Sequence, residues 1–412
     1  MNELARRIAV TLGLLLVYRL GSHLIIPGID AAIWRQVFEA SEAGLLGNAN
    51  AVSGGAIGRL SIFALGLVPY LTAAVLIQVA SVVSAGLRAI PQSGEAGRRR
   101  IVRYTLVLTL LLATFQGFMI ASSLQRIDSL VLNPGPLFVV TTTLTLAGGA
   151  LLVSWVAEQI TLRGIGNGIA LILLTGIALE IPRAVVGGLQ LNNLGVISPD
   201  LLLGLAVLTV IMVLAISFAE QVRILLPVQF AARNIGDRAV AAQSSALSFK
   251  LNNAGIIPAV VAPWFFYLPL AALALLFGAQ QPWLRSIIQQ MQAGQPAHMI
   301  FNAVVIGVLA FVYTASVIDP DRIAERLQAS GGAVPGIAAG EATADLIDRS
   351  VTRATTVGAF YLALVYLIPE LLVAYAKVPF YLGGASALIA VGAVLDIDAQ
   401  VRALAAPSKL GD

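Results

Sequence analysis

Ten apolar runs, each long enough to cross a bilayer as a helix, constrain the fold of this chain more than any other feature. A helix of about 20 apolar residues spans the hydrocarbon core of a membrane. Only 11% of the 412 residues are charged, which is too few to cover the surface of a soluble protein. The sequence therefore predicts an all-α polytopic membrane protein with ten transmembrane helices. The candidate spans are 8–26, 61–83, 104–124, 137–160, 169–190, 201–222, 254–278, 297–317, 355–376 and 379–397.

The basic residues predict how these spans are oriented. If the N-terminus faces the cytoplasm, 18 of the 25 Lys and Arg residues lie in segments on the cytoplasmic side. Cytoplasmic loops of membrane proteins carry an excess of Lys and Arg. We therefore expect both termini in the cytoplasm, with large cytoplasmic loops at 223–253 and 318–354.

An outer loop near residues 191–200 divides the spans into two sets of five. Because five is odd, two similar halves must sit in opposite orientations across the membrane. Inverted repeats of this kind occur in many transport proteins, whose pathway lies between the halves. We therefore expect an N-terminal half at 1–190 and a C-terminal half at 191–412.

The stretch between Asp30 and Arg59 is neither a good span nor an ordinary loop. It contains the string GNANAVSGGAIG at 47–58, which is rich in small, mildly apolar residues. Irregular backbone at membrane depth is tolerated only where it is buried in protein or lines a watery cavity. Two interpretations stay open on these residues alone: a surface loop on the outer face, or a re-entrant half-helix before the second span.

The sequence contains no catalytic motif. It has no GxxxxGK[ST] phosphate loop and no Ser/His/Asp or HExxH arrangement. It has no cysteine, and its two histidines, His23 and His298, are too few for a histidine metal centre. The run GIGNG at 164–168 lacks a preceding strand and fits a turn between two spans. We therefore expect neither an enzyme nor a protein that holds a metal or cofactor.

Ionisable residues inside spans are costly and by default mark functional sites. Arg19, Glu158, Glu370 and Asp396 each lie near a span end, where a long side chain reaches the interface. The lack of an acidic residue at mid-membrane disfavours an ion-coupled carrier. The span centres instead hold aliphatic residues, which by themselves are typical of lipid-facing or core positions. They are Leu67, Leu71, Leu173, Val260 and Ile389.

Seven long strings match a known family, in order along nearly the whole chain. Two of them are SGGAIGRLSIFALGLVPYLTAAVLIQ at 53–78 and AAQSSALSFKLNNAGIIPAV at 241–260. The others lie at 7–30, 94–105, 158–169, 334–349 and 381–396. These strings resemble the SecY family of protein-translocation channel subunits. The resemblance implies a channel subunit that passes unfolded polypeptides across the membrane or releases apolar segments sideways into it.

The same resemblance implies functional roles for residues whose side-chain types alone indicate none. The five aliphatic residues match a constriction ring formed by spans two, five, seven and ten. The segment 45–59 matches a plug helix on the outer side of the ring. The candidate plug residues are Leu45, Asn48, Ser53, Gly54, Gly55 and Arg59. A lateral gate lies in the family between spans two–three and seven–eight. Polar positions of the gate or its cytoplasmic approach are matched by Thr72, Gln78, Asn167 and Asn252.

The resemblance also implies partners and a location in the plasma (inner) membrane. SecE-like and SecG-like small membrane subunits would assemble with the chain. Signal peptides and nascent polypeptides would enter it, and apolar segments would leave it for the lipid bilayer. A SecA motor or the ribosome would dock on basic residues of the cytoplasmic face. The candidate docking residues are Arg98, Arg99, Arg100, Arg223, Arg233, Arg238, Lys250 and Arg322.

The cytoplasmic loops depart from the family pattern where such partners dock. Ala338 replaces a common arginine, DPDR at 319–322 replaces an NPRE-like string, and Gln328 and Ala329 replace a lysine pair. Loop 318–354 carries four basic and six acidic residues. We therefore expect weakened coupling to the motor or the ribosome. Two alternatives stay open: an accessory SecY-like channel with non-standard partners, and a secondary transporter with five-plus-five inverted repeats.

Overall fold

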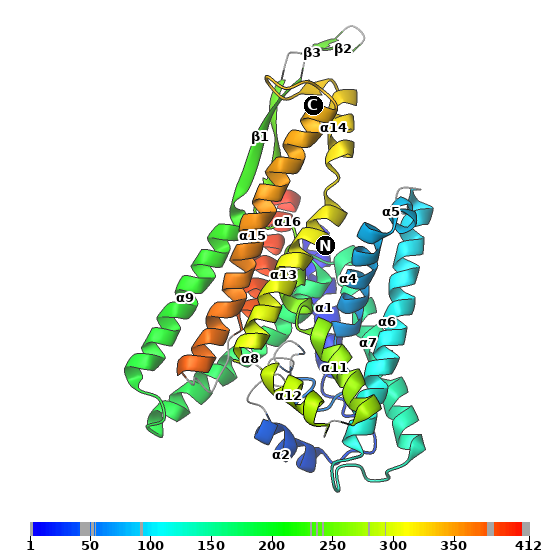
Figure 1. The fold of residues 1–412 in the computed structure, drawn as a ribbon, viewed down its shortest axis with the longest axis vertical. Helices are drawn as coiled ribbons and strands as arrows, with labels where there is room; N and C mark the ends of the chain where they lie inside the picture. The colour runs from blue at the N-terminus through cyan, green and yellow to red at the C-terminus, as the bar shows by residue number, and fades with distance from the viewer. Residues whose placement is uncertain are drawn as a thin grey trace.

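The computed structural model shows an elongated bundle of helices, with a β-hairpin and a short helix projecting from one end (Figure 1). The chain is mostly helical, as the sequence predicts. The structure describes residues 3–41, 50, 53, 55–90, 94–230, 233–235, 238–240, 243–278, 281–292, 294–376 and 383–405.

The elements follow one another along the chain as helices interrupted by one group of strands. The helices before residue 194 are α1 (Glu3–Gly21), α2 (Ala31–Ser41), α4 (Val68–Val83), α5 (Ala85–Ala89), α6 (Glu95–Leu124), α7 (Pro136–Arg163) and α8 (Gly168–Asn193). Those after it are α9 (Pro199–Gln221), α10 (Ile257–Val261), α11 (Trp264–Phe277), α12 (Pro282–Gln290), α13 (Pro296–Val317), α14 (Pro320–Ala329), α15 (Glu341–Ala376) and α16 (Gly384–Ala405). The strands are β1 (Arg223–Phe230), β2 (Arg233–Ile235), β3 (Arg238–Val240), β4 (Gln243–Lys250) and β5 (Gly332–Ala333).

Several long helices begin where the sequence supplies a start signal. Proline occupies the first turn of α7, α9, α13 and α14, where its missing N–H costs no hydrogen bond. Asn167, Ser198 and Asp319 cap α8, α9 and α14, because each side chain accepts a backbone N–H of the first turn. These signals place the starts of α7, α8, α9 and α13 close to those of the predicted spans.

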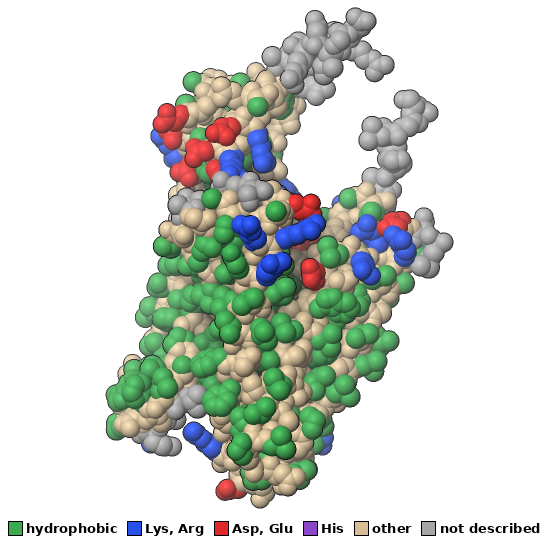
Figure 2. Space-filling model, turned by 90° about the vertical axis from the view of Figure 1, so that its right-hand side faces the viewer, with side chains coloured by type: hydrophobic (Ala, Val, Ile, Leu, Met, Phe, Trp, Pro, Cys, Tyr) green, Lys and Arg blue, Asp and Glu red, His purple; other side chains and the backbone are tan. Residues whose placement is uncertain are grey.

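Seven helical segments of the described residues are long and apolar enough to cross a membrane. They are α6, α7, α8, α9, the α10–α11 pair up to Ala274, α13 with α14, and α15 up to Leu372. Figure 2 shows hydrophobic side chains over the middle of the bundle, and Lys and Arg gathered toward its projecting end. The chain is a multi-pass membrane protein. The predicted spans 8–26, 61–83 and 379–397 correspond to α1, α4 and α16, which lie outside this set, so the total of ten stays a prediction.

The predicted span 61–83 is helical only in part. Residues 61–67 form turns, and α4 begins after them. Gly66 has a φ of +53°, a left-handed value that an α-helix does not use, and Pro69 lies in the first turn of α4. The helix therefore starts where the backbone can first adopt helical angles.

The predicted span 254–278 is also interrupted. It divides at Pro263 into the short helix α10 and the longer helix α11. A proline inside a helix removes one backbone hydrogen bond and crowds the preceding turn, so one helix ends there and another begins.

The two large loops contain regular structure that the sequence analysis does not anticipate. Within loop 223–253, β1 and β4 form an antiparallel hairpin, and β5 pairs with the other edge of β1. In β4, Leu247 and Phe249 alternate with polar residues, which is the signal of a half-buried strand. Loop 318–354 contains α14 and the first turns of α15, so it is an ordered projection and not an open loop.

Helices from both predicted halves share the interior of the bundle. The largest cluster of buried apolar side chains draws on α1, α4, α7, α8, α10, α13, α15 and α16. A second cluster packs α2 and residues 60–65 against α6 and α7. Between the predicted halves, α4 contacts α10 and α13, and α8 contacts α9 and α16. The division at residue 190 itself stays a prediction.

The packing of α7 depends on a glycine. A Cβ atom on Gly149 would overlap the backbone carbonyl of Ile62, which cannot rotate away. We expect Gly149→Ala to lower the free energy of unfolding by about 1–3 kcal/mol, the usual cost of overpacking. Thermal unfolding of the purified protein measures the change. Gly148→Ala is the matched control, because nothing lies within 4 Å of its Cβ position. Equal stabilities of the two variants would contradict the close contact of Gly149 with Ile62.

Candidate functional site

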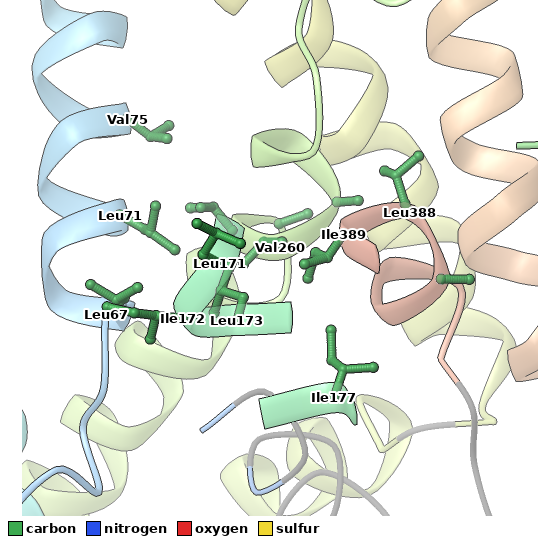
Figure 3. Close-up of a cluster of buried hydrophobic side chains, with 14 of the residues drawn as sticks. Leu67, Leu71, Val75, Leu171, Ile172, Leu173, Ile177, Val260, Leu388 and Ile389 are labelled. Atoms are coloured by element: carbon green, nitrogen blue, oxygen red, sulfur yellow. The ribbon is translucent and has the colours of Figure 1, made fainter. Parts of the chain in front are cut away.

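The aliphatic residues singled out in the sequence lie in one buried cluster (Figure 3). Leu67 and Leu71 come from the start of α4, and the others come from α8, α10 and α16. Figure 3 shows the side chains of Leu71, Val260 and Ile389 converging from three separate elements. The complete set is Leu67, Leu71, Leu173, Val260 and Ile389, all of them buried.

Local geometry explains part of this convergence. Leu67 is the N-cap residue of α4 and Leu71 follows it by four positions, so both side chains lie on one face of the helix. Val260 lies on α10, the short helix that ends before Pro263. Other buried side chains of the same cluster surround these residues: Val75, Leu171, Ile172, Ile177 and Leu388.

A cavity of about 470 Å³ adjoins the aliphatic cluster. Leu71, Leu173 and Val260 form part of its lining. The rest includes charged side chains contributed by α9, α16 and the base of the β1–β4 hairpin, namely Glu220, Arg223, Lys250, Asp396 and Asp398. One part of the cavity is therefore apolar, and another part presents charges of both signs.

Two predicted gate residues, Asn167 and Asn252, lie at this cavity. Oδ1 of Asn167 accepts the backbone N–H of Ile169 at 3.0 Å, so the residue caps α8. Asn252 donates from Nδ2 to Oε1 of Glu220 at 2.7 Å, and its Oδ1 accepts the N–H of Gly255 at 3.0 Å. Asn252 thus joins the end of α9 to the turn before α10. The sequence analysis overlooks Glu220, although a carboxylate in the last turn of an apolar helix is a visible signal.

The other two predicted gate residues, Thr72 and Gln78, lie on α4. We call the contact of α4 and α6 with α10, α11 and α13 the seam. A small pocket in the seam is lined by Val75, Gln78, Ile257, Pro258, Leu309, Val312 and Tyr313. Oγ1 of Thr72, Oε1 of Gln78 and, on α13, Oγ1 of Thr314 are buried without a hydrogen-bond partner among the described residues. The helices of the seam therefore carry polar groups that the present packing leaves unsatisfied.

The predicted plug segment 45–59 lies largely outside the described residues. Leu45, Asn48 and Gly54 are outside them, whereas Ser53, Gly55 and Arg59 are described. Asn50 is helical, Ser53 and residues 55–59 form turns, and Asn50 and Ser53 are buried.

Three side-chain hydrogen bonds hold the described end of this segment. The hydroxyl of Tyr18 donates to the carbonyl of Ser53 at 3.0 Å, and Nε1 of Trp34 donates to the carbonyl of Ile57 at 3.0 Å. Nε of Arg59 donates to the carbonyl of Ser22 at 3.0 Å. Among the described residues of this segment, Ser53 and residues 55–59 are fixed by α1, α2 and the turn after α1. They do not form an exposed surface loop.

The candidate docking residues lie toward the projecting end of the bundle. Arg98, Arg99 and Arg100 are exposed at the start of α6. Arg223 and Lys250 are cross-strand partners at the base of the β1–β4 hairpin, and both are exposed. The remaining candidates lie on β2, β3 and α14 and are Arg233, Arg238 and Arg322.

Acidic side chains gather on the projection, with basic side chains beside them (Figure 2). Arg322 itself forms an ion pair with Asp319 at 3.2 Å. Ala338 is exposed in the turn that precedes α15. The exposed acidic residues of α14 and α15 are Asp321, Glu325, Glu341, Asp345 and Asp348. The acidic excess counted in the sequence is therefore on the surface.

One interpretation of the charged span residues is wrong. Glu370 does not reach the interface, because it is 3% exposed and pairs with His298 on α13. Its side chain turns inward to a hydrogen-bonding partner that lies 72 positions away in the sequence. Glu158 and Asp396 are exposed, as expected for residues near span ends.

Comparison with known proteins places the chain in a family. A SecY family model matches residues 61–397. The protein translocase subunit SecY of Escherichia coli (strain K12) is 41% identical over 409 residues, which cover 98% of this chain and 92% of the relative. The chain belongs to the SecY family. The translocase subunit SecY of Vibrio cholerae is 39% identical over 408 residues, with the same coverage of 98% and 92%.

Solved structures of this class share the fold. A structure described as a protein conducting channel matches with a TM-score of 0.67 at 18% identity, covering 99% of this SecY-family chain and 95% of its own. Sec61 in the canine ribosome-channel complex matches with a TM-score of 0.64 at 17% identity, with coverages of 99% and 95%.

The Asn252–Glu220 hydrogen bond yields a stability prediction. We expect Asn252→Ala to lower the free energy of unfolding by about 1–3 kcal/mol, because it leaves the Gly255 N–H without its partner and the half-buried Glu220 carboxylate with only the longer bond from Tyr361. Asn253→Ala is the matched control, since Asn253 is half-buried and its side chain donates to the nearby carbonyl of Lys250 in an exposed hydrogen bond. Thermal unfolding of both variants measures the difference. A larger loss for Asn253→Ala would contradict the assigned role.

Proposed function

We propose that this chain is the pore-forming subunit of a protein-translocation channel. It moves unfolded polypeptides across the membrane and releases apolar segments into the bilayer. Family membership supports the assignment, and one observation carries it: five aliphatic side chains from four helices meet beside a cavity that residues of both predicted halves line. The relatives are named as translocase subunits, and the chain acts by conduction without catalysing a reaction.

The aliphatic cluster is the constriction of this channel. Its side chains offer no hydrogen-bond donor or acceptor, so a passing polypeptide finds no polar group to bind. When no polypeptide is present, the same side chains pack against one another, and a dewetted apolar constriction resists the passage of ions. The described end of segment 45–59 supports the plug assignment, because Ala56 is buried in the same cluster as Leu67 and Leu71.

The seam is the lateral exit. Polar contacts between helices in membranes contribute only about 0.6–2 kcal/mol, so an interface of this kind can open at modest cost. The unpaired oxygens of Thr72, Gln78 and Thr314 weaken the closed form further, because opening gives them access to water or to a guest segment. An apolar signal-peptide segment then partitions from the channel into lipid.

The constriction can be tested with a charged substitution. We expect Leu71→Asp to hydrate the cluster and to raise the ion leak of reconstituted vesicles several-fold, because a carboxylate retains water in a narrow apolar passage. Leu71→Met is the matched control, since it conserves volume and apolarity. The leak is measured as the decay of a membrane potential. An unchanged leak in a folded Leu71→Asp protein would contradict the assignment.

The cytoplasmic face and its partners complete the proposal. The concentration of Lys and Arg toward one end of the bundle supports cytoplasmic termini and a location in the plasma (inner) membrane. SecE-like and SecG-like subunits would flank the chain, and a SecA motor or the ribosome would dock on the projection. The acidic surface of α14 and α15 favours weakened coupling, or an accessory channel with a non-standard partner.

Charge reversal on the projection tests this coupling. We expect Ala338→Arg combined with Asp321→Arg to strengthen binding to ribosomes, most clearly at low salt, because neutralisation of RNA phosphates dominates such affinity. Ala338→Gln with Asp321→Asn is the neutral control of similar size. Cosedimentation at two salt concentrations measures the effect. If the unmodified chain already supports motor-driven translocation at the rate of a typical family member, the proposed weakening is wrong.

A further inference from the structure

A buried polar cluster joins α11, α13 and α15 at the end of the bundle opposite the β1–β4 hairpin. His298 and Glu370 are each 3% exposed, and Nδ1 of His298 contacts Oε1 of Glu370. The same carboxylate oxygen accepts the backbone N–H of Gly294 at 3.0 Å. Glu370 on α15 thus binds both the start of α13 and the segment that precedes it.

The surrounding hydrogen bonds indicate which ring nitrogen of His298 faces Glu370 as a donor. Nδ2 of Asn302 donates to the backbone carbonyl of His298 at 3.0 Å and lies 3.0 Å from Nε2 of the same residue. Because a carbonyl oxygen only accepts, the amide presents its NH₂ group to both atoms. Nε2 is therefore an acceptor, and the ring proton is on Nδ1, facing Glu370. The hydroxyl of Tyr267 on α11 lies 3.2 Å from Nε2, within reach to donate to it.

The cluster is costly for a membrane protein to maintain. Oε2 of Glu370 and Oδ1 of Asn302 are buried without a hydrogen-bond partner among the described residues. A buried carboxylate that is incompletely paired destabilises the fold. Ionisable groups at membrane depth are rare and tend to mark function. We therefore expect the Glu370–His298 pair to have a role beyond packing in the core.

Two of the helices that this cluster joins, α11 and α13, lie on one side of the seam. α13 contacts α4, and α11 contacts α6. Phe266 on α11 packs edge-on against the ring of His298, with centroids 5.6 Å apart, and against Phe301 at 5.5 Å. Tyr267 and Phe266 thus attach α11 to α13, while Glu370 attaches α13 to α15.

We propose that Glu370 and His298 are positioning residues that hold α11 and α13 against α15 and thereby keep the seam closed. The inference rests on the proposed function of the seam as a lateral exit. Loss of the Glu370 acceptor leaves the Nδ1–H of His298 and the N–H of Gly294 without a partner. The start of α13 is then free to move toward the lipid, and α11 moves with it.

Two variants of Glu370 separate hydrogen bonding from packing. Glu370→Met removes the acceptor at similar volume, whereas Glu370→Gln keeps an acceptor oxygen for His298 and Gly294. We expect Glu370→Met to raise the ion leak of reconstituted vesicles about tenfold, the effect of losing one charged hydrogen bond. Glu370→Gln restores a leak close to that of the original protein. Thr355→Val is the matched control for a buried polar loss on α15, because its hydroxyl donates only within that helix.

A direct measurement of the seam uses the absence of cysteine from the chain. Val75→Cys on α4 and Leu309→Cys on α13 introduce thiols into the same small pocket, and a short bis-maleimide cross-links them. We expect Glu370→Met to lower the yield of cross-linking several-fold and Glu370→Gln to leave it high. Cross-linked Glu370→Met protein should regain a low leak. Tyr267→Phe is a milder change that replaces Glu370→Met if that variant does not fold. It should likewise raise the ion leak and lower the yield of cross-linking.

The outcomes distinguish this inference from the proposed function. The positioning role would be overturned if Glu370→Met kept the cross-linking yield and the ion leak of the original protein. It would also be overturned if Glu370→Gln were as defective as Glu370→Met. A leak that persists after cross-linking would also overturn it, because the path would then lie outside the seam. Failure of the proposed function has a separate signature: Leu71→Asp would not leak, while the effect of Glu370 on cross-linking would remain.

Discussion

Satisfaction of backbone hydrogen bonds in lipid is the constraint on which the structure depends. Helices meet it within one segment, and irregular backbone is tolerated only inside the protein. The turns before α4 obey this rule, because the N–H of Ile26 binds the carbonyl of Leu60 and the N–H of Ile62 binds that of Leu24. In the turn at 164–168, Thr11 accepts the N–H of Ile165. Non-helical segments therefore lie where other parts of the chain supply partners.

These interior breaks bring the residues of the aliphatic cluster together. Because α4 begins late and α10 ends early, their first and last turns deliver Leu67, Leu71 and Val260 to one region. Continuous spans would run past one another with fewer side chains converging. The cavity beside the cluster follows from the same geometry, since the turn held by Asn252 directs the chain from α9 and the hairpin into α10.

Polar groups inside the bundle divide into two kinds. Those of the seam are unpaired on α4 and α13, which lowers the cost of separating these helices. Those around Glu370 form a dense network that joins helices on one side of the seam. A channel that opens sideways needs both, because its two sides must separate while each side stays intact. The hydrogen bonds are thus dense beside the seam, whereas the seam itself contains unpaired polar groups.

The sequence by itself determined the helical membrane class, the positions of most spans and the family, because apolar run length and long matching strings are local signals. It also indicated the aliphatic residues that the structure gathers into one cluster. The hairpin of loop 223–253, the late start of α4 and the pairing of Glu370 with His298 emerged only from the tertiary structure. Each depends on partners distant in the chain: β1 needs β4, and the turns at 61–67 need the carbonyl of Leu24. Glu370 looked like an interfacial residue because its position near a span end was visible, whereas the imidazole that draws it inward belongs to another helix.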